Sequence, residues 1–160
     1  MPNWCMNSAT ITGSKEKLEA IVEAIKEEKL FEYLAPIGEW DYGTAVETWG
    51  TKWEAQDVDW DLDYDSNTLT LNFSTAWGPG INAYILGMEN HDLEIEAYYY
   101  EPGMMFCGYF DNGDDTCWEI DFVDEEYKDD IDQHVIDHWD LDYEYESWKE
   151  WQEEENEDED

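Results

Sequence analysis

The chain has 160 residues, with 44 acidic side chains against seven basic ones, and all seven bases are lysines. The formal net charge of -37 argues against binding to nucleic acid or to an anionic membrane, because those surfaces repel a negative protein. Aromatic residues make up 16% of the chain, too many for a disordered acidic protein. We therefore expect one folded domain over residues 1–148 and a disordered acidic tail over residues 149–160.

The first third of the chain predicts a strand followed by a helix. The segment NWCMNSATITG alternates in polarity and ends at Gly13, as a strand does. Ser14 is placed to cap a helix whose apolar residues follow the 3.6-residue period and continue toward Leu34. A loop rich in Gly, Pro and Trp is expected over residues 35–51.

The middle of the chain predicts mainly strands. DVDWDLDYD and TLTLNFSTAW predict an antiparallel hairpin, and INAYILGME predicts a short helix after the GPG break. LEIEAYYYE predicts a further strand, and Asn112-Gly113 marks a second hairpin between MMFCGYF and CWEIDF. The order β-α-β-β-α-β with an added hairpin predicts an α+β, ferredoxin-like sandwich, with the helices on one face of an antiparallel sheet.

The C-terminal region is acidic and less regular. Apolar residues recur at every fourth position from about residue 124 to residue 139, which predicts an amphipathic helix. The next segment, WDLDYEYES, repeats the Trp-Asp-Leu-Asp-Tyr pattern of residues 60–64. It fits either a second edge strand with acids on one face or a helix end with a linker.

The segment DVDWDLDYD, residues 57–65, has an acid at every second position, which raises the question of a metal site. A calcium loop of the EF-hand type that begins at Asp57 needs glycine at its sixth position and glutamate at its twelfth, but these positions hold Leu62 and Thr68. Alternate residues of a strand also lie in a row about 6.7 Å apart, whereas calcium ligands converge at about 2.4 Å. We expect no specific metal site and no cofactor.

A row of carboxylates on a strand is similar to the regularly spaced phosphates of DNA. We expect the acids of this strand to contact a partner protein, and the C-terminal acids to extend the pattern. The candidate contact residues are Asp57, Asp59, Asp61, Asp63 and Asp65 on the strand, and Asp129, Asp130, Asp132, Asp137, Asp140, Asp142, Glu144 and Glu146 in the C-terminal region.

The absence of arginine fits such a display, because arginine pairs bidentately with neighbouring carboxylates and would neutralise them. Trp60 and Tyr64 are expected on the opposite side of the strand, where they would hold it on the core. Trp40, Tyr42 and Trp49 in the loop are candidates for aromatic contacts with the partner.

Four motifs follow one another along residues 1–110: MPNWCMN with ITG, WGTKWEA, FSTAWGPG and YYEPGMMFCGYF. Together they resemble the YubB ferredoxin-like domain family of phages and mobile elements. The resemblance implies the same β-α-β-β-α-β domain and a phage-like origin, and it supplies no reaction and no catalytic residues. Residues 78–80 are Gly-Pro-Gly, where that family usually has Ser-Pro-Pro.

The sequence gives little support to enzyme chemistry, and we expect no catalytic residues. His134 and His138 lie four residues apart, which suits a zinc pair on one helical face, but HVIDH lacks the glutamate of a zincin. The negative field disfavours the thiolates of Cys5, Cys107 and Cys117. With no CxxC pair, no signal peptide and no apolar run of roughly 20 residues, a reduced protein of the host cytoplasm is expected.

These observations predict a non-enzymatic inhibitor from a phage or mobile element. As an acidic DNA mimic, it would occupy the DNA- or RNA-binding surface of a host CRISPR effector, restriction enzyme or other nuclease. One alternative is an acidic interaction or scaffold protein whose partner does not bind nucleic acid. Another is an acidic surface that serves only solubility or adaptation to salt.

Overall fold

Two interleaved β-α-β units form the centre of the computed structural model, which describes residues 3–124 and 126–158. In each unit a helix crosses one face of the sheet and the two strands leave room for a third strand between them. The elements of the two units are β1 (Trp4–Thr12), α1 (Lys15–Lys26) and β2 (Gln56–Asp63), then β3 (Thr68–Ala76), α4 (Ile81–His91) and β4 (Glu94–Glu101).

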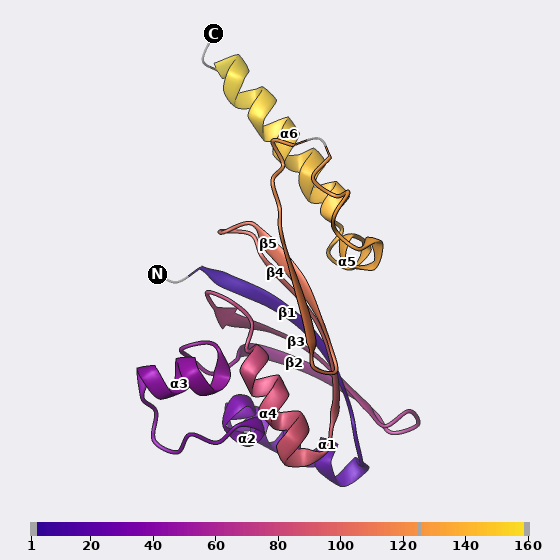
Figure 1. The fold of residues 1–160 in the computed structure, drawn as a ribbon. Helices are drawn as coiled ribbons and strands as arrows, with labels where there is room; N and C mark the ends of the chain where they lie inside the picture. The colour runs from indigo at the N-terminus through magenta and orange to yellow at the C-terminus, as the bar shows by residue number, and fades with distance from the viewer. Residues whose placement is uncertain (1–2, 125, 159–160) are drawn as a thin grey trace.

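The strands form a six-stranded antiparallel sheet in the order β2-β3-β1-β4-β5-β6 (Figure 1). Its first four strands have the arrangement of a ferredoxin-like domain. β5 (Phe106–Asp111) and β6 (Asp114–Glu119) extend the sheet past β4 as a hairpin that turns at Asn112-Gly113, where both residues have positive φ. The predicted ferredoxin-like fold with an added hairpin is confirmed.

One face of the sheet is covered by α1, α2 (Leu30–Leu34), α3 (Tyr42–Trp49) and α4 (Figure 1). Alternate residues of β1, β3 and β4 point toward these helices and are almost completely buried, as the two-residue period of a strand requires. We call this cluster the first core. Its largest fully buried side chains are Ile11, Leu18, Ile21, Leu30, Phe31, Leu34, Leu69, Leu71, Tyr84, Ile95 and Phe110.

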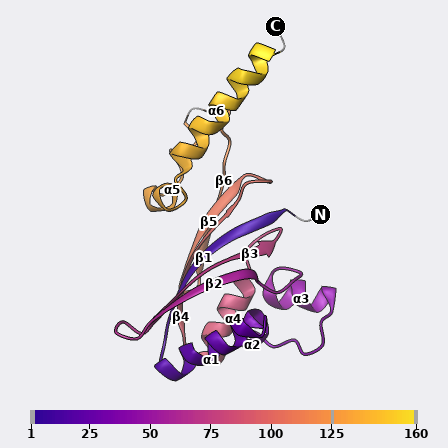
Figure 2. The same ribbon diagram turned by 180° about the vertical axis from the view of Figure 1, so that it is seen from behind.

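The opposite face is covered only over β4, β5 and β6, by the chain that follows β6. Here α5 (Gln133–Trp139) contacts β4 and β5, and α6 (Leu141–Asp158) extends away from the sheet (Figure 2). We call this cluster the second core. Its buried residues are Tyr100, Cys107, Ile120, Phe122, Tyr127, Ile131, Val135, Ile136 and Leu141. Over β2, β3 and β1, no helix of the described residues covers this side of the sheet, and we call this part the open face.

The region between β1 and β2 contains more helices than predicted. α1 ends at Lys26, and Glu28, with φ of 61°, interrupts the expected continuous helix, so residues 30–34 form the separate α2. The prediction of a loop over residues 35–51 is wrong for α3. This helix is capped by Asp41, which accepts the Thr44 N–H at 3.0 Å, but it buries only two of its eight residues, so the sequence has almost no helical period to detect.

The C-terminal region also differs from its prediction. The helix expected over residues 124–139 forms only from Gln133, and the described residues before it make turns through which Tyr127 and Ile131 still reach the second core. WDLDYEYES belongs to the end of α5 and the start of α6, so it is not an edge strand. Residues 149–158, expected as a disordered tail, continue α6. No helix of the described ranges is long and apolar enough to cross a membrane.

Candidate acidic binding surface

The acids of β2 lie at the edge of the open face. Asp59, Asp61 and Asp63 are exposed and sit opposite Asn72, Thr70 and Thr68 of β3. Alternate residues of a strand are spaced by about 6.7 Å, so the three carboxylates form a straight row along the sheet edge. Within the described residues, no salt bridge involves Asp59, Asp61 or Asp63, so no lysine or histidine of the chain neutralises these carboxylates by direct pairing.

The predicted row of five carboxylates is corrected to three. The pairing of β2 with β3 shifts between Gln56 and Asp59, and Asp57 lies within this β-bulge with φ of 53°. Such a bulge re-aims the side chain and breaks the two-residue alternation. Asp65 lies in the hairpin turn, where its N–H donates to the Asp63 carboxylate at 2.9 Å. Asp57 and Asp65 are exposed but stand outside the straight row.

The other side of β2 faces α1, but its aromatic residues are not what anchors the strand. Val58 and Leu62 pack on the first core, whereas Trp60 and Tyr64 remain 42% and 56% exposed. Two lysines of α1 lie over these rings, Lys26 Nζ at 5.9 Å from the Trp60 centroid and Lys15 Nζ at 5.5 Å from that of Tyr64. The prediction that Trp60 and Tyr64 hold the strand on its core is therefore replaced by smaller aliphatic contacts and cation–π contacts.

The strand register extends the acidic surface across the open face. One row runs from Asp61 through Thr70 and Thr10 to Glu96, and continues to Asp111 and Asp114. The next row runs from Asp63 through Thr68 and Thr12 to Glu94. Hydroxyl groups therefore occupy the centre of the open face, and carboxylates flank them on both sides. The alternation in LEIEAYYYE indicates that Glu94 and Glu96 share one face of the strand, but neither was among the predicted contact residues.

Positive charge is absent from the strands. None of the six strands contains a lysine, and the lysines nearest β2 lie on α1, on the helix-covered side. The charged residues that the strands present on the open face are consequently all acidic. A negative potential over this face follows directly from the sequence once the strand faces are known.

The C-terminal acids lie elsewhere on the molecule. Asp129, Asp130 and Asp132 are on the turns before α5 rather than on a helix, and Asp137 and Asp140 are on α5 and at its end. Asp142, Glu144 and Glu146 are on α6. All eight are exposed, but α5 and α6 lie at the β4–β6 side of the sheet, away from the β2–β3 hairpin (Figures 1 and 2). They form a second acidic region and do not extend the row on β2.

The histidine pair packs against the sheet. His138 stacks on Tyr98 with ring centroids 4.0 Å apart, and His134 Nδ1 is 3.0 Å from the Tyr98 hydroxyl oxygen. Burial lowers the pKa of His138 below its ordinary value of 6.5, with a smaller opposing effect from Glu96. Among the described residues no group of three or more His, Cys, Asp or Glu side chains is arranged to hold a metal. The arrangement makes both imidazoles structural parts of the α5 contact.

The cysteines are poorly suited to nucleophilic chemistry. Cys5 and Cys107 are buried, and burial raises the pKa of each thiol to about 12. Cys117 is exposed, and partial burial raises its pKa as well. A thiol with a raised pKa is almost entirely protonated near neutral pH, and only the thiolate is a good nucleophile.

The aromatic residues predicted to contact a partner divide into two groups. Trp49 is 2% exposed and donates its indole N–H to the Ala35 carbonyl at 2.8 Å, so it belongs to the first core. Trp40 and Tyr42 are 52% and 60% exposed at the start of α3. Only these two remain available at the surface.

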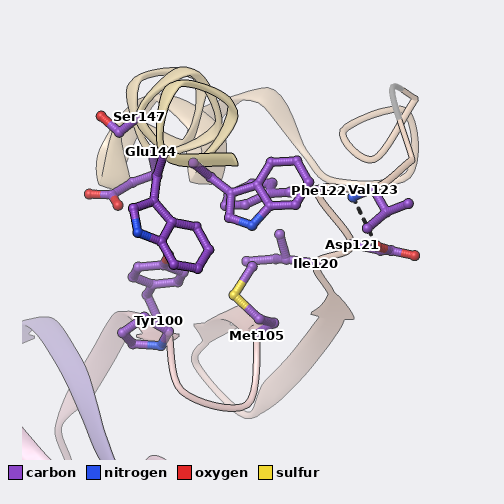
Figure 3. A pocket seen from close by; sticks show the side chains of 11 residues that line it. Tyr100, Met105, Ile120, Asp121, Phe122, Val123, Glu144 and Ser147 are labelled. Atoms are coloured by element: carbon purple, nitrogen blue, oxygen red, sulfur yellow. Dashed lines mark hydrogen bonds between the residues drawn. The ribbon is translucent and has the colours of Figure 1, made fainter. Parts of the chain in front are cut away.

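A pocket of about 500 Å³ lies between the end of the sheet and α6 (Figure 3). Figure 3 shows Tyr100 and Met105 on the sheet side, Ile120 and Phe122 beside them, and Glu144 on α6 across the pocket. Burial, with a smaller effect from the Glu144 charge, raises the pKa of Tyr100 to about 12. The remaining lining residues are Pro102, Asp121, Val123, Ser147, Trp148 and Trp151.

The chain belongs to the Api92-like family, because the model of the ferredoxin-like domain in Api92-like proteins matches residues 48–159. It is also similar to the crystal structure of a protein api92 from Yersinia pseudotuberculosis, with 25% sequence identity and a TM-score of 0.39. That similarity covers 50% of this chain and 30% of the Yersinia protein, so this chain spans well under half of that protein's length. No curated protein matches the chain.

The resemblance to the YubB family is therefore wrong as a family assignment. Residues of the motifs that carried it make buried or partly buried hydrogen bonds within the scaffold. Asn7 donates to the Thr75 hydroxyl at 2.9 Å, Thr51 donates to the Ala76 carbonyl at 2.7 Å, and buried Glu101 accepts the N–H groups of the Gly103-Met104 turn at 2.7 Å. These residues serve packing and turn formation, so their short motifs identify the scaffold and not one family.

Proposed function

We propose that this member of the Api92-like family is a non-enzymatic inhibitor that occupies the basic, nucleic-acid-binding surface of another protein. The target class is a host defence protein such as a CRISPR effector, a restriction enzyme or another nuclease, and the place of action is the cytoplasm. The phage origin followed from the YubB resemblance and loses that support. Charge and geometry alone support the proposal.

The observation that carries the proposal is the open face, whose strands contain no lysine. Three unpaired carboxylates line its β2 edge, and the register places Glu94 and Glu96 on the far side of the threonine rows. Asp61 and Glu96 are three strand spacings apart, or roughly 14 Å. The acids of β2 and those of β4 are therefore separated by a distance comparable to the width of the B-DNA major groove, which is about 12 Å and has phosphates on both sides.

The absence of an activated nucleophile supports a binding role. The thiols have raised pKa values, and both histidines are engaged with Tyr98. A protein that blocks a nucleic-acid-binding surface needs no chemistry, because complementary charge steers the encounter and occupation of the surface excludes the substrate.

The test is retention of lysate proteins on the immobilised chain. Proteins are captured at about 50 mM salt and released at about 500 mM, a range over which charge screening increases strongly. A DNA duplex is then used as competitor, with polyglutamate of equal total charge as its control. The proposal expects nucleic-acid-binding proteins in the retained fraction, and it expects the duplex to displace them better than polyglutamate does.

The site is tested with two matched triple variants. Asp59→Asn/Asp61→Asn/Asp63→Asn removes three charges from the open face, and Asp129→Asn/Asp130→Asn/Asp132→Asn removes three from the turns before α5. We expect the first to lower the affinity for the captured protein by about tenfold or more and the second to have a much smaller effect. Equal losses would show a nonspecific effect of net charge, and a retained fraction without nucleic-acid-binding proteins would reject the function.

A further inference from the structure

The pocket beside α6 combines aromatic walls with acidic groups at its rim. Glu144, Ser147, Trp148 and Trp151 follow one another at the spacing i, i+3, i+4, i+7, so they share one face of the helix. Phe122 lies 6.0 Å from Trp148 between ring centroids, and Tyr100 forms part of the opposite wall (Figure 3). Among the described residues, the charged ones in the lining are Glu144 and Asp121.

Four aromatic rings elsewhere in this protein show that a cation is one kind of group such a wall attracts. Lysines of the chain itself lie over Trp60, Tyr64, Trp53 and Trp77, at 4.3 to 5.9 Å from the ring centroids. Within the described residues no lysine lies over Trp148 or Trp151. The Trp148 ring already contacts Phe122 and Tyr145, and Lys149 lies over Tyr145. Trp151 is 52% exposed and therefore offers the larger free aromatic surface to a cation from outside.

An uncharged guest fits this pocket less well than a cation. Trp151 is 52% exposed, so a bound side chain would cover apolar surface that now faces water. A purely apolar guest would, however, partly desolvate Glu144 without giving it a partner, which is unfavourable. A planar guanidinium group stacks on aromatic rings, is weakly hydrated, and pairs with a carboxylate through two N–H groups.

We propose that the pocket binds an arginine side chain of a partner protein, with the guanidinium group stacked on the α6 tryptophans and paired with Glu144. This inference deepens the proposed function, because it adds a second contact point for a basic partner, near α6 and away from the β2 edge that carries the row of carboxylates. It assigns a role to Glu144 different from that of the other C-terminal acids, which line no such pocket in the described chain.

The test is a titration of the full chain with the peptide Ac-Gly-Arg-Gly-NH₂, followed by NMR of the indole N–H signals. The citrulline peptide, which has nearly the same shape and no charge, is the main control, and the lysine peptide is the second. We expect saturable shifts of the Trp148 and Trp151 signals with a Kd in roughly the millimolar range, and binding of the citrulline peptide at least about tenfold weaker. Equal affinity for the citrulline or the lysine peptide would overturn the guanidinium assignment.

Matched variants locate the site. Glu144→Gln should weaken binding of the arginine peptide at least about fivefold, whereas Glu146→Gln, on the same helix but outside the pocket, should leave it unchanged. Trp151→Leu should weaken it and Trp77→Leu, an equally exposed tryptophan outside this pocket, should not. Equal effects within either pair would overturn the proposal. The titration contains no nucleic-acid-binding protein, so its failure leaves the proposed function to its own test with the Asp59, Asp61 and Asp63 variants.

Discussion

The first core is closed by four helices and is rich in aliphatic side chains, whereas the second core is closed by turns and two helices, and most of the partly buried side chains packed against it are aromatic. Over the first core, α1 presents apolar residues at a regular period and buries them almost completely. Over the second core, Phe122 and Tyr127 reach the sheet from irregular backbone. A large aromatic ring covers enough area for a few residues to close a surface, and the pocket beside α6 is lined by several of these rings.

The largest effect is expected in the first core. Phe31 is completely buried and lies 5.8 Å from Trp49 and 6.1 Å from Phe73 between ring centroids. Phe31→Ala should lower the free energy of unfolding by about 3–5 kcal/mol, because it removes buried apolar surface and leaves a cavity. Urea denaturation measures the change, with exposed Tyr42→Ala as control. A loss below about 1 kcal/mol would mean that α2 is not an integral part of this core.

A smaller effect is expected in the second core. Trp148 packs on Phe122 and Tyr145 but is only partly buried. Trp148→Ala should lower the free energy of unfolding by about 1–2 kcal/mol, less than Phe31→Ala, because part of its surface already faces water. If the two substitutions proved equally destabilising, the contrast between a closed and an open core would not hold.

The row on β2 is expected to contribute almost nothing to stability. Asp59→Asn/Asp61→Asn/Asp63→Asn should shift the melting temperature by less than about 3 °C, and upward if at all, because it removes repulsion between exposed like charges. Circular dichroism measures the shift at low and high salt. A large drop in melting temperature would show that these carboxylates have a structural role, which would weaken their assignment to partner binding.

The smallest effect concerns the pH dependence of the second core. Because burial lowers the pKa of His138, the unfolded chain binds a proton that the folded chain does not, in the range between the folded pKa and 6.5. The stability of the wild type should therefore fall relative to His138→Gln as the pH drops from about 7.5 to about 5.5. The comparison of the two proteins cancels the general effect of titrating the other acids. Parallel stability curves would contradict the shift.

The strands were predictable because successive side chains of a strand point to opposite faces of the sheet. A strand with one buried face therefore alternates between apolar and polar residues in the sequence. Both hairpins and the capped start of α1 at Ser14 followed in the same way. α3 was not predictable, since its short helix buries two residues and lies within a segment rich in glycine and tryptophan. The C-terminal helix was misplaced because Tyr127 and Ile131 keep a four-residue spacing while lying on turns.

The candidate site was predictable only in part. The sequence indicates an acidic strand, but it does not indicate that Asp57 lies in a β-bulge, because acidic and apolar residues alternate without interruption from Asp57 onward. It also contains the acids of β4, yet their position across from β2 depends on strand order, which requires the fold. The pocket joins residues of the sheet and of α6 and has no local signature.

The bulge at Asp57 affects how β2 meets other proteins. An edge strand carries free backbone N–H and C=O groups, and these can recruit a strand from another molecule into a longer sheet. Here the left-handed residue interrupts the straight backbone, and the acids beyond it would repel a second copy of the same strand. Copies of this protein should therefore not join through their β2 edges, and a partner should contact β2 through its side chains and not through main-chain pairing.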